Sequence, residues 1–212
     1  PARSACLLSA RSLQHWRQHQ RHLGFIVPTG NLGTALAAML ARECGLPIGP
    51  IALATNANRG LADFFAGADY APRASVATLA NAMDVGAPSN FERLRWLYPD
   101  AGALRGMFRA GWVDDAEIRD VITHGKVRHG DVLCPHTATA ARLYERLRAA
   151  DDETDYALVA TAHASKFDQV VEPLIGASVP VPPSLQALLQ RPAHAQCMSA
   201  TYADLQRALA AA

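Results

Sequence analysis

Two glycines, Gly30 and Gly33, lie in a turn-rich stretch between an apolar run at residues 25–27 and a helical pattern rich in alanine and leucine. Where a strand leads into a helix, the unpaired N–H groups of the first helical turn and the helix dipole favour an anion, most often a phosphate. Glycine lets the backbone approach such an anion closely. The spacing matches neither the dinucleotide fingerprint nor the nucleotide-binding loop that ends in lysine. The pattern predicts a phosphate site, with an ordinary tight turn as the alternative.

Lysine is scarce, and Lys126 and Lys166 are the only side chains that could form a Schiff base. Lys126 lies in a polar stretch that we expect to be a solvated loop. Lys166 follows an apolar run at residues 156–162, which predicts a buried strand with a ligand crevice at its end. A surface lysine at a helix start is an equally good interpretation. His136 and His163 have no further ligand at metal-binding spacing, so no metal site is expected.

The composition is that of a globular protein. Half of the 212 residues are hydrophobic, 18% are charged and the mean hydropathy is +0.01, which excludes a disordered chain and membrane spans. The formal net charge of +1 gives no field for general nucleic-acid binding. Four cysteines are scattered singly, a pattern that fits a reducing cytoplasm better than a disulfide framework. We expect neither a nucleic-acid nor a membrane partner.

The elements that must position these residues alternate between short apolar runs and helical patterns from residue 25 onward, which is typical of a parallel sheet covered by helices. We expect a three-layer α/β domain with a mostly parallel sheet over residues 24–179. Residues 1–23 carry basic but no acidic side chains and are expected to form a solvated helix or loop. Three prolines from residue 180 predict a linker and C-terminal helices over residues 180–212. The start at Pro1 suggests a processed product or a fragment.

Six stretches, in this order, resemble threonine synthase, an enzyme of fold type II that depends on pyridoxal phosphate. The matching stretches are Pro28-Thr29-Gly30-Asn31-Leu32-Gly33, Gly45-Leu46-Pro47-Ile48, Ala54-Thr55-Asn56-Ala57-Asn58, Ala82-Met83-Asp84-Val85 with Pro88-Ser89-Asn90-Phe91-Glu92-Arg93, Pro135-His136-Thr137-Ala138, and Thr161-Ala162-His163 with Lys166-Phe167. The resemblance implies an incomplete large domain of the tryptophan-synthase-β type.

The resemblance also implies roles for particular residues. It implies that the cofactor phosphate is held by the loop Gly30, Asn31, Leu32, Gly33 and Thr34. Thr161 would face the pyridine nitrogen of the cofactor. The substrate phosphate would lie at Ser89, Asn90 and Arg93, because a helix start and a guanidinium suit a phosphate dianion. The intact family enzyme converts O-phospho-L-homoserine and water to L-threonine and phosphate.

The chain departs from the family pattern in several places. The Phe-Lys-Asp segment that supplies the Schiff-base lysine is absent, so no catalytic residue is assigned and the chain alone is expected to be inactive without the missing N-terminal portion. Cys134, Ala164, Leu32 and Thr34 stand where the family usually has aspartate, proline, an aromatic residue and asparagine. These changes leave backbone phosphate binding possible.

Two other functions remain open. A non-catalytic threonine-synthase-like remnant or regulatory protein would also suit the missing lysine and the motif departures. A nucleotide-binding α/β domain would use the same glycine loop, but it needs an acidic residue that binds ribose about 20 residues further on. The end of the second predicted strand offers only Asn56 and Asn58.

Overall fold

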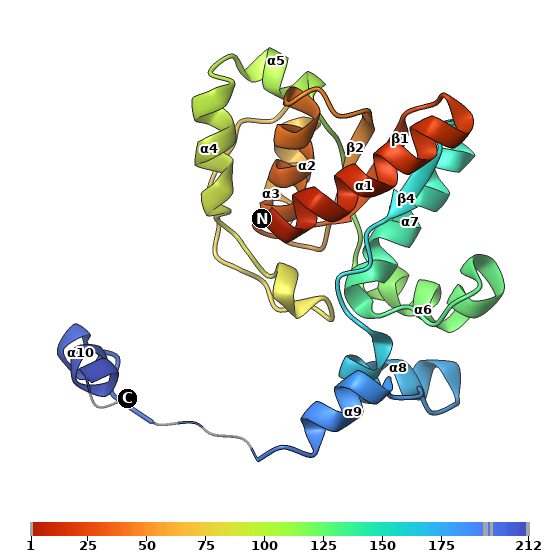
Figure 1. Cartoon of the computed structure of the whole chain (residues 1–212). Helices are drawn as coiled ribbons and strands as arrows, with labels where there is room; N and C mark the ends of the chain where they lie inside the picture. The colour runs from red at the N-terminus through yellow and green to blue at the C-terminus, as the bar shows by residue number, and fades with distance from the viewer. Residues whose placement is uncertain (1, 193–194, 196, 211–212) are drawn as a thin grey trace. The chain divides into compact units, whose positions relative to one another are not determined.

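A computed structural model describes residues 2–192, 195 and 197–210, which divide into two compact units at Val179/Pro180. The first unit contains α1 (Ala2–His19), β1 (Leu23–Pro28), α2 (Gly33–Glu43), β2 (Ile48–Thr55), α3 (Gly60–Phe65), the 3-10 helix η1 (Asn81–Met83), α4 (Ser89–Leu97), α5 (Ala101–Gly106), β3 (Arg109–Trp112), α6 (Asp115–His129), α7 (Pro135–Ala149), β4 (Tyr156–Leu158), the 3-10 helix η2 (Ala164–Phe167) and α8 (Asp168–Ile175) (Figure 1). The second unit contains α9 (Pro183–Leu189) and α10 (Tyr202–Ala210). In the described residues no helix is both long enough and apolar enough to cross a membrane.

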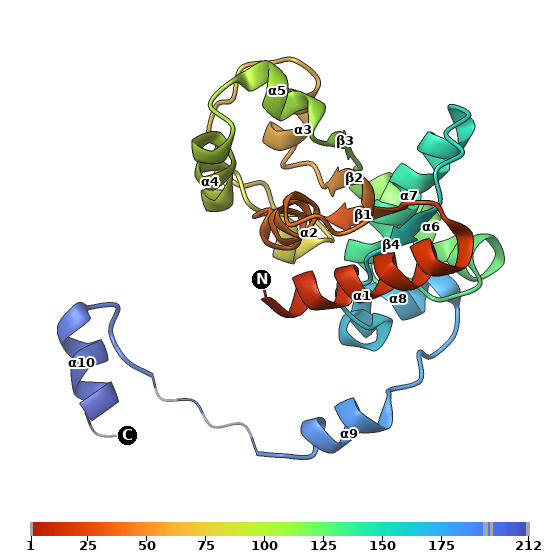
Figure 2. The ribbon, with the colours of Figure 1, turned by 45° about the horizontal axis from the view of Figure 1, so that its top comes forward.

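The four strands form one sheet in the order β3-β2-β1-β4, and every neighbouring pair is parallel. Helices α1 and α2 pack against β1 and β2 on one face, whereas α7 packs on the other face with α6 behind it (Figure 2). This arrangement confirms the predicted α/β fold with a parallel sheet. A parallel sheet covered on both faces needs strands that are apolar on both sides, as β1 and β2 are.

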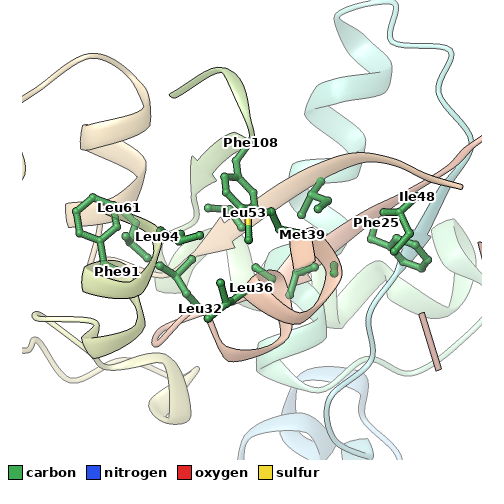
Figure 3. Packing of buried hydrophobic residues seen from close by; sticks show 14 of the residues in the cluster. Phe25, Leu32, Leu36, Met39, Ile48, Leu53, Leu61, Phe91, Leu94 and Phe108 are labelled. Carbon is green, nitrogen blue, oxygen red and sulfur yellow. The ribbon is translucent and has the colours of Figure 1, made fainter. Parts of the chain in front are cut away.

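Alternate residues of β1 divide between two hydrophobic clusters. Phe25 and Val27 belong to the cluster that α2 covers, whereas Ile26 contacts the cluster formed with Ala140 and Leu143 of α7. Figure 3 shows the α2 side of the core, which extends from Phe25 and Ile48 through Met39 and Leu36 to Leu94 and Phe91 of α4. The core therefore ties α4 to α2, and with it the two loops that precede these helices.

Two predicted elements differ from the structure. The strand expected over residues 156–162 ends at Leu158, because β4 is an edge strand that pairs with β1 alone. Beyond this point β1 offers Pro28, which has no N–H to donate. The stretch around Lys126, expected to be a loop, belongs to α6, which runs on to His129 and ends at Gly130 in the left-handed conformation.

Candidate functional site at the carboxyl edge of the sheet

The order of the strands reverses beside β1. The chain runs from β1 to β2 and β3 on one side of β1, and then crosses to β4 on its other side. The connecting helices α2 and α7 lie on opposite faces of the sheet. In open α/β sheets, ligands bind at the carboxyl ends of the strands where the strand order reverses. The reversal places this position between the loop that follows β1 and the segment that follows β4.

The loop after β1 leaves the N-terminus of α2 free of protein acceptors. Leu32 precedes the helix in the left-handed conformation, with φ 60° and ψ 7°, and its side chain gives no cap. The Leu32 N–H donates to Thr29 Oγ1 at 3.0 Å, and the first helical bond joins Leu36 N–H to Leu32 O at 2.8 Å. Among the described residues, no acceptor meets the N–H groups of residues 33–35. Such an end of a helix binds anions.

In the same unit, the N-terminus of α6 is capped by side chains of the protein, unlike that of α2. The N-terminus of α6 carries a capping box, in which Asp114 accepts from the Glu117 N–H at 2.8 Å and the Glu117 carboxylate reaches back to the Asp114 N–H. Two acids in its first turn further complement the helix dipole, whereas the first turn of α2 contains no acid. The sequence therefore fills the anion position at α6 with its own carboxylates and leaves that of α2 open.

The two glycines of the loop do different things. A Cβ at Gly30 would lie 2.8 Å from Met83 Cα and 2.9 Å from Met83 O, so glycine is required there by the close approach of η1. A Cβ at Gly33 would meet no atom within 4 Å. Neither glycine is left-handed, and the loop residue that adopts this conformation is Leu32.

A polar network fixes η1 at the end of β2. The Asp84 carboxylate accepts from Asn56 Nδ2 at 2.7 Å, from Asn58 Nδ2 at 3.2 Å, and from the N–H and hydroxyl of Thr78 at 3.1 and 2.7 Å. Asn56 is fully buried, so its amide needs these partners. Neither Asn56 nor Asp84 was predicted from the sequence to hold η1. Two asparagines directly after a buried strand were the available signal, because buried amides at a strand end require partners.

The structure joins the two stretches that were expected to bind phosphates. Asn31 exchanges hydrogen bonds with the Ser89 hydroxyl at 3.1 and 3.2 Å, and Asn90 Nδ2 donates to the Asn31 carbonyl at 2.7 Å. The start of α4 is thereby held against the glycine loop. Arg93, one turn further along α4, lines a groove with Leu36, Leu40, Glu92, Trp96 and Leu97.

Thr161 and Lys166 lie in the segment after β4. Thr161 is exposed and follows an edge strand that is only half-buried, in contrast to the buried strand expected there. The Val159 N–H donates to Ile26 O at 3.0 Å, which keeps this segment beside the end of β1. Lys166 is exposed in η2, and Lys126 is exposed in α6.

His136, in the first turn of α7, contacts η1 at the carboxyl edge of the sheet. Its side chain is 3% exposed, and its Nε2 accepts a hydrogen bond from the Ala82 N–H at 3.1 Å. Burial lowers the pKa of His136, while the negative charge of Asp84 opposes this effect. The ring is therefore neutral with its proton on Nδ1, as the acceptor role of Nε2 requires.

Comparisons with known proteins give the same family as the motifs. The family model described as threonine synthase, C-terminal, matches residues 137–209. Threonine synthase of Serratia marcescens is 32% identical over 198 residues, which cover 91% of this chain and 44% of that protein. The pyridoxal-phosphate-bound threonine synthase of Brucella melitensis superposes with a TM-score of 0.77 at 28% identity, covering 89% of this chain and 46% of the other. The threonine synthase of Escherichia coli superposes with a TM-score of 0.76 at 30% identity, covering 92% of this chain and 45% of the other.

The chain spans less than half of the length of the curated relatives that it matches. The fold predicted for it, that of the fold-type-II enzymes, is confirmed by these structures. In sequence and in fold the chain is similar to part of threonine synthase, and the resemblance that its motifs indicated is confirmed.

Proposed function

We propose that the uncapped N-terminus of α2 binds the phosphate of pyridoxal 5'-phosphate. The observation that carries this proposal is the set of N–H groups at residues 33–35, which lie at the strand-order reversal and meet no acceptor within the part of the chain that the structure describes. The residues present fit a phosphate, because the space in front of Gly33 is open and the dipole of α2 is uncompensated. The likeness to the pyridoxal-phosphate-bound threonine synthase of Brucella melitensis supports the same ligand.

The proposal assigns the residues as follows. The loop Gly30, Asn31, Leu32, Gly33 and Thr34 holds the cofactor phosphate through backbone N–H groups. Thr161, which follows β4 on the other side of the strand-order reversal, provides a neutral hydroxyl for the pyridine nitrogen. Ser89 and Asn90 orient the loop through Asn31 and face the substrate phosphate, to which Arg93 adds its charge.

We further propose that the intact protein is a threonine synthase, which converts O-phospho-L-homoserine and water to L-threonine and phosphate. The bound cofactor supplies an electron sink that stabilises negative charge on substrate carbon atoms. A lysine must hold the cofactor and move protons in this chemistry. The two lysines of this chain are exposed and stand outside the glycine loop, so we expect the chain alone to bind the cofactor without turnover. The free state of its four cysteines suits the proposed cytoplasmic location.

A carboxylate placed in the first turn of α2 tests the phosphate site. Thr34→Asp should raise stability by about 0.3–1 kcal/mol, because an anion at a helix N-terminus complements the dipole. The same change should lower the affinity for inorganic phosphate and pyridoxal phosphate at least tenfold, since one charged hydrogen bond contributes about 1.5–3 kcal/mol. Thr34→Asn is the neutral control of the same shape. Calorimetric titration that gives equal phosphate affinity in both variants would refute the site.

The coding frame upstream of Pro1 tests the proposed activity. A frame that encodes a lysine-bearing segment supports the enzyme, and the protein expressed from it should release phosphate from O-phospho-L-homoserine. A start codon next to Pro1 would instead favour the remnant or regulatory protein. Phosphate release that is absent from the longer protein, with the cofactor bound, would reject the threonine synthase proposal.

A further inference from the structure

A chain of contacts links a buried histidine to the glycine loop. His136 Nε2 accepts from the Ala82 N–H at 3.1 Å, and Ala82 is the middle residue of η1. The next residue, Met83, places its backbone against Gly30, where there is no room for a Cβ. Thr139, one turn after His136 on α7, contacts the sulfur of Met83 at 4.0 Å. The position of η1 against the loop thus depends on the start of α7.

The ring of His136 can hold η1 in only one protonation state. In the neutral ring with the proton on Nδ1, Nε2 carries a lone pair that accepts the Ala82 N–H. A protonated ring has N–H groups at both positions, so two donors would face each other across 3.1 Å. Nδ1 has no partner among the described residues, and the ring rests against Phe167 with the ring centroids 5.0 Å apart. The ring therefore makes no other hydrogen bond among the described residues that could replace the one to Ala82, and η1 is then held by the Asp84 network and by the contact of Thr139 with Met83.

We propose that His136 is a positioning residue for the anion site, and that protonation of its ring removes the bond to Ala82 and so loosens η1 and the glycine loop that it packs against. The inference rests on the proposed function for the identity of the anion, but the coupling between His136 and η1 stands on the contacts alone. Its consequence is a loss of phosphate affinity in acid that exceeds the loss caused by protonation of the phosphate itself, and this excess should disappear when residue 136 cannot titrate.

The charged surroundings of the ring set the direction of the effect. Asp84, on the segment that follows η1, favours the protonated ring, whereas burial disfavours it more strongly and lowers the pKa of His136 from 6.5. From the side of η2 the ring meets the uncharged Phe167. The bond to Ala82 is therefore intact above the ordinary histidine pKa and is lost as the pH falls through the lowered pKa.

Hydrogen exchange at the Ala82 amide measures this bond in the whole chain. Between about pH 7.5 and about pH 4.5, the wild-type protection factor of Ala82, corrected for intrinsic exchange, should fall at least about fivefold because a net hydrogen bond is lost. The amide of Leu53 in β2, which is fully buried, serves as the internal reference and should keep its protection. A protection factor of Ala82 that does not change with pH would overturn the proposal, and this measurement needs no variant.

Two variants separate a positioning role from a merely structural one. Gln in His136→Gln carries an acceptor oxygen near the position of Nε2 but does not titrate, so Ala82 should stay protected at both pH values. His136→Leu fills the site without an acceptor and should leave Ala82 unprotected at both. The affinity for inorganic phosphate should follow the same order, and equal pH dependence in wild type and His136→Gln would overturn the proposal. If no form binds phosphate, the proposed function fails, while the exchange pattern still decides the role of His136.

Discussion

Adding one methyl group to each glycine of the loop in turn should change stability in opposite directions. In Gly30→Ala, the new Cβ would lie 2.8 Å from Met83 Cα, a backbone atom that cannot move without displacing η1. Overpacking of this kind costs about 1–3 kcal/mol. In Gly33→Ala, the Cβ points into open space at the first residue of α2. Glycine-to-alanine changes at compatible backbone positions stabilise by about 0.4–1 kcal/mol.

The two variants should therefore differ by roughly 1.5–4 kcal/mol in the free energy of unfolding. For a chain of this size, 1 kcal/mol corresponds to a Tm shift of about 2–4 °C. We expect Gly30→Ala to lower Tm by roughly 2–12 °C and Gly33→Ala to raise it by about 1–4 °C. Gly33→Ala should nevertheless bind inorganic phosphate at least about tenfold more weakly, because its methyl group occupies space that the anion needs.

Thermal unfolding followed by circular dichroism gives the stability of both variants, and calorimetry gives their phosphate affinity. A Gly30→Ala protein as stable as the wild type would show that the contact with Met83 does not constrain the loop. A Gly33→Ala protein with unchanged phosphate affinity would show that the open space at Gly33 is not where the anion binds.

Two further predictions concern charged side chains outside the loop. Asp84→Asn should lower the free energy of unfolding by about 2–3 kcal/mol, because the carboxylate accepts four hydrogen bonds from three residues. Urea titration measures this loss of stability, and the variant of an exposed residue, Asp69→Asn, is the control. Equal losses of stability in the two variants would contradict the role of the network. The pKa of Asp120 is lowered from 3.8 to about 2, first by the hydrogen bond from Arg128 and then by that from Arg142, so its contribution to stability is complete above pH 3.8 and is lost as the pH falls toward about 2. Asp120→Asn should flatten the acid side of the stability profile, and an unchanged profile would show that these ion pairs contribute nothing.

The sequence predicted those parts of the fold that local patterns determine. The strand before Gly30 and the helix after it follow from an apolar run and a helical pattern that are contiguous in the chain. The helix start at Ser89 and Asn90 was likewise predicted from residues that are contiguous in the chain. The joining of Asn31 to Ser89 is not a local property, because it depends on the packing of α4 against α2 through Phe91 and Leu94.

Features that arise from tertiary contacts escaped prediction. The early end of β4 follows from the position of Pro28 in a neighbouring strand, which the apolar run at residues 156–162 does not reveal. His136 was considered as a metal ligand and set aside, but its partner is a backbone amide 54 residues away in the chain, a contact that no local pattern indicates. The left-handed conformation of Leu32 was likewise hidden, because leucine rarely adopts it without tertiary support.

The pairing of β1 with β4 also determines when the candidate site can be complete during synthesis of the chain. Gly24 is translated before its partner Tyr156, and β2, β3, α6 and α7 are translated between them. Contacts between residues so distant in sequence form late, because the loop between them must close first. The glycine loop and the uncapped end of α2 can form early, but their surroundings are completed only when His136 and Val159 have been added. Nascent chains that stop before residue 159 should therefore expose one side of β1, so the candidate site is incomplete until most of the first unit has been translated.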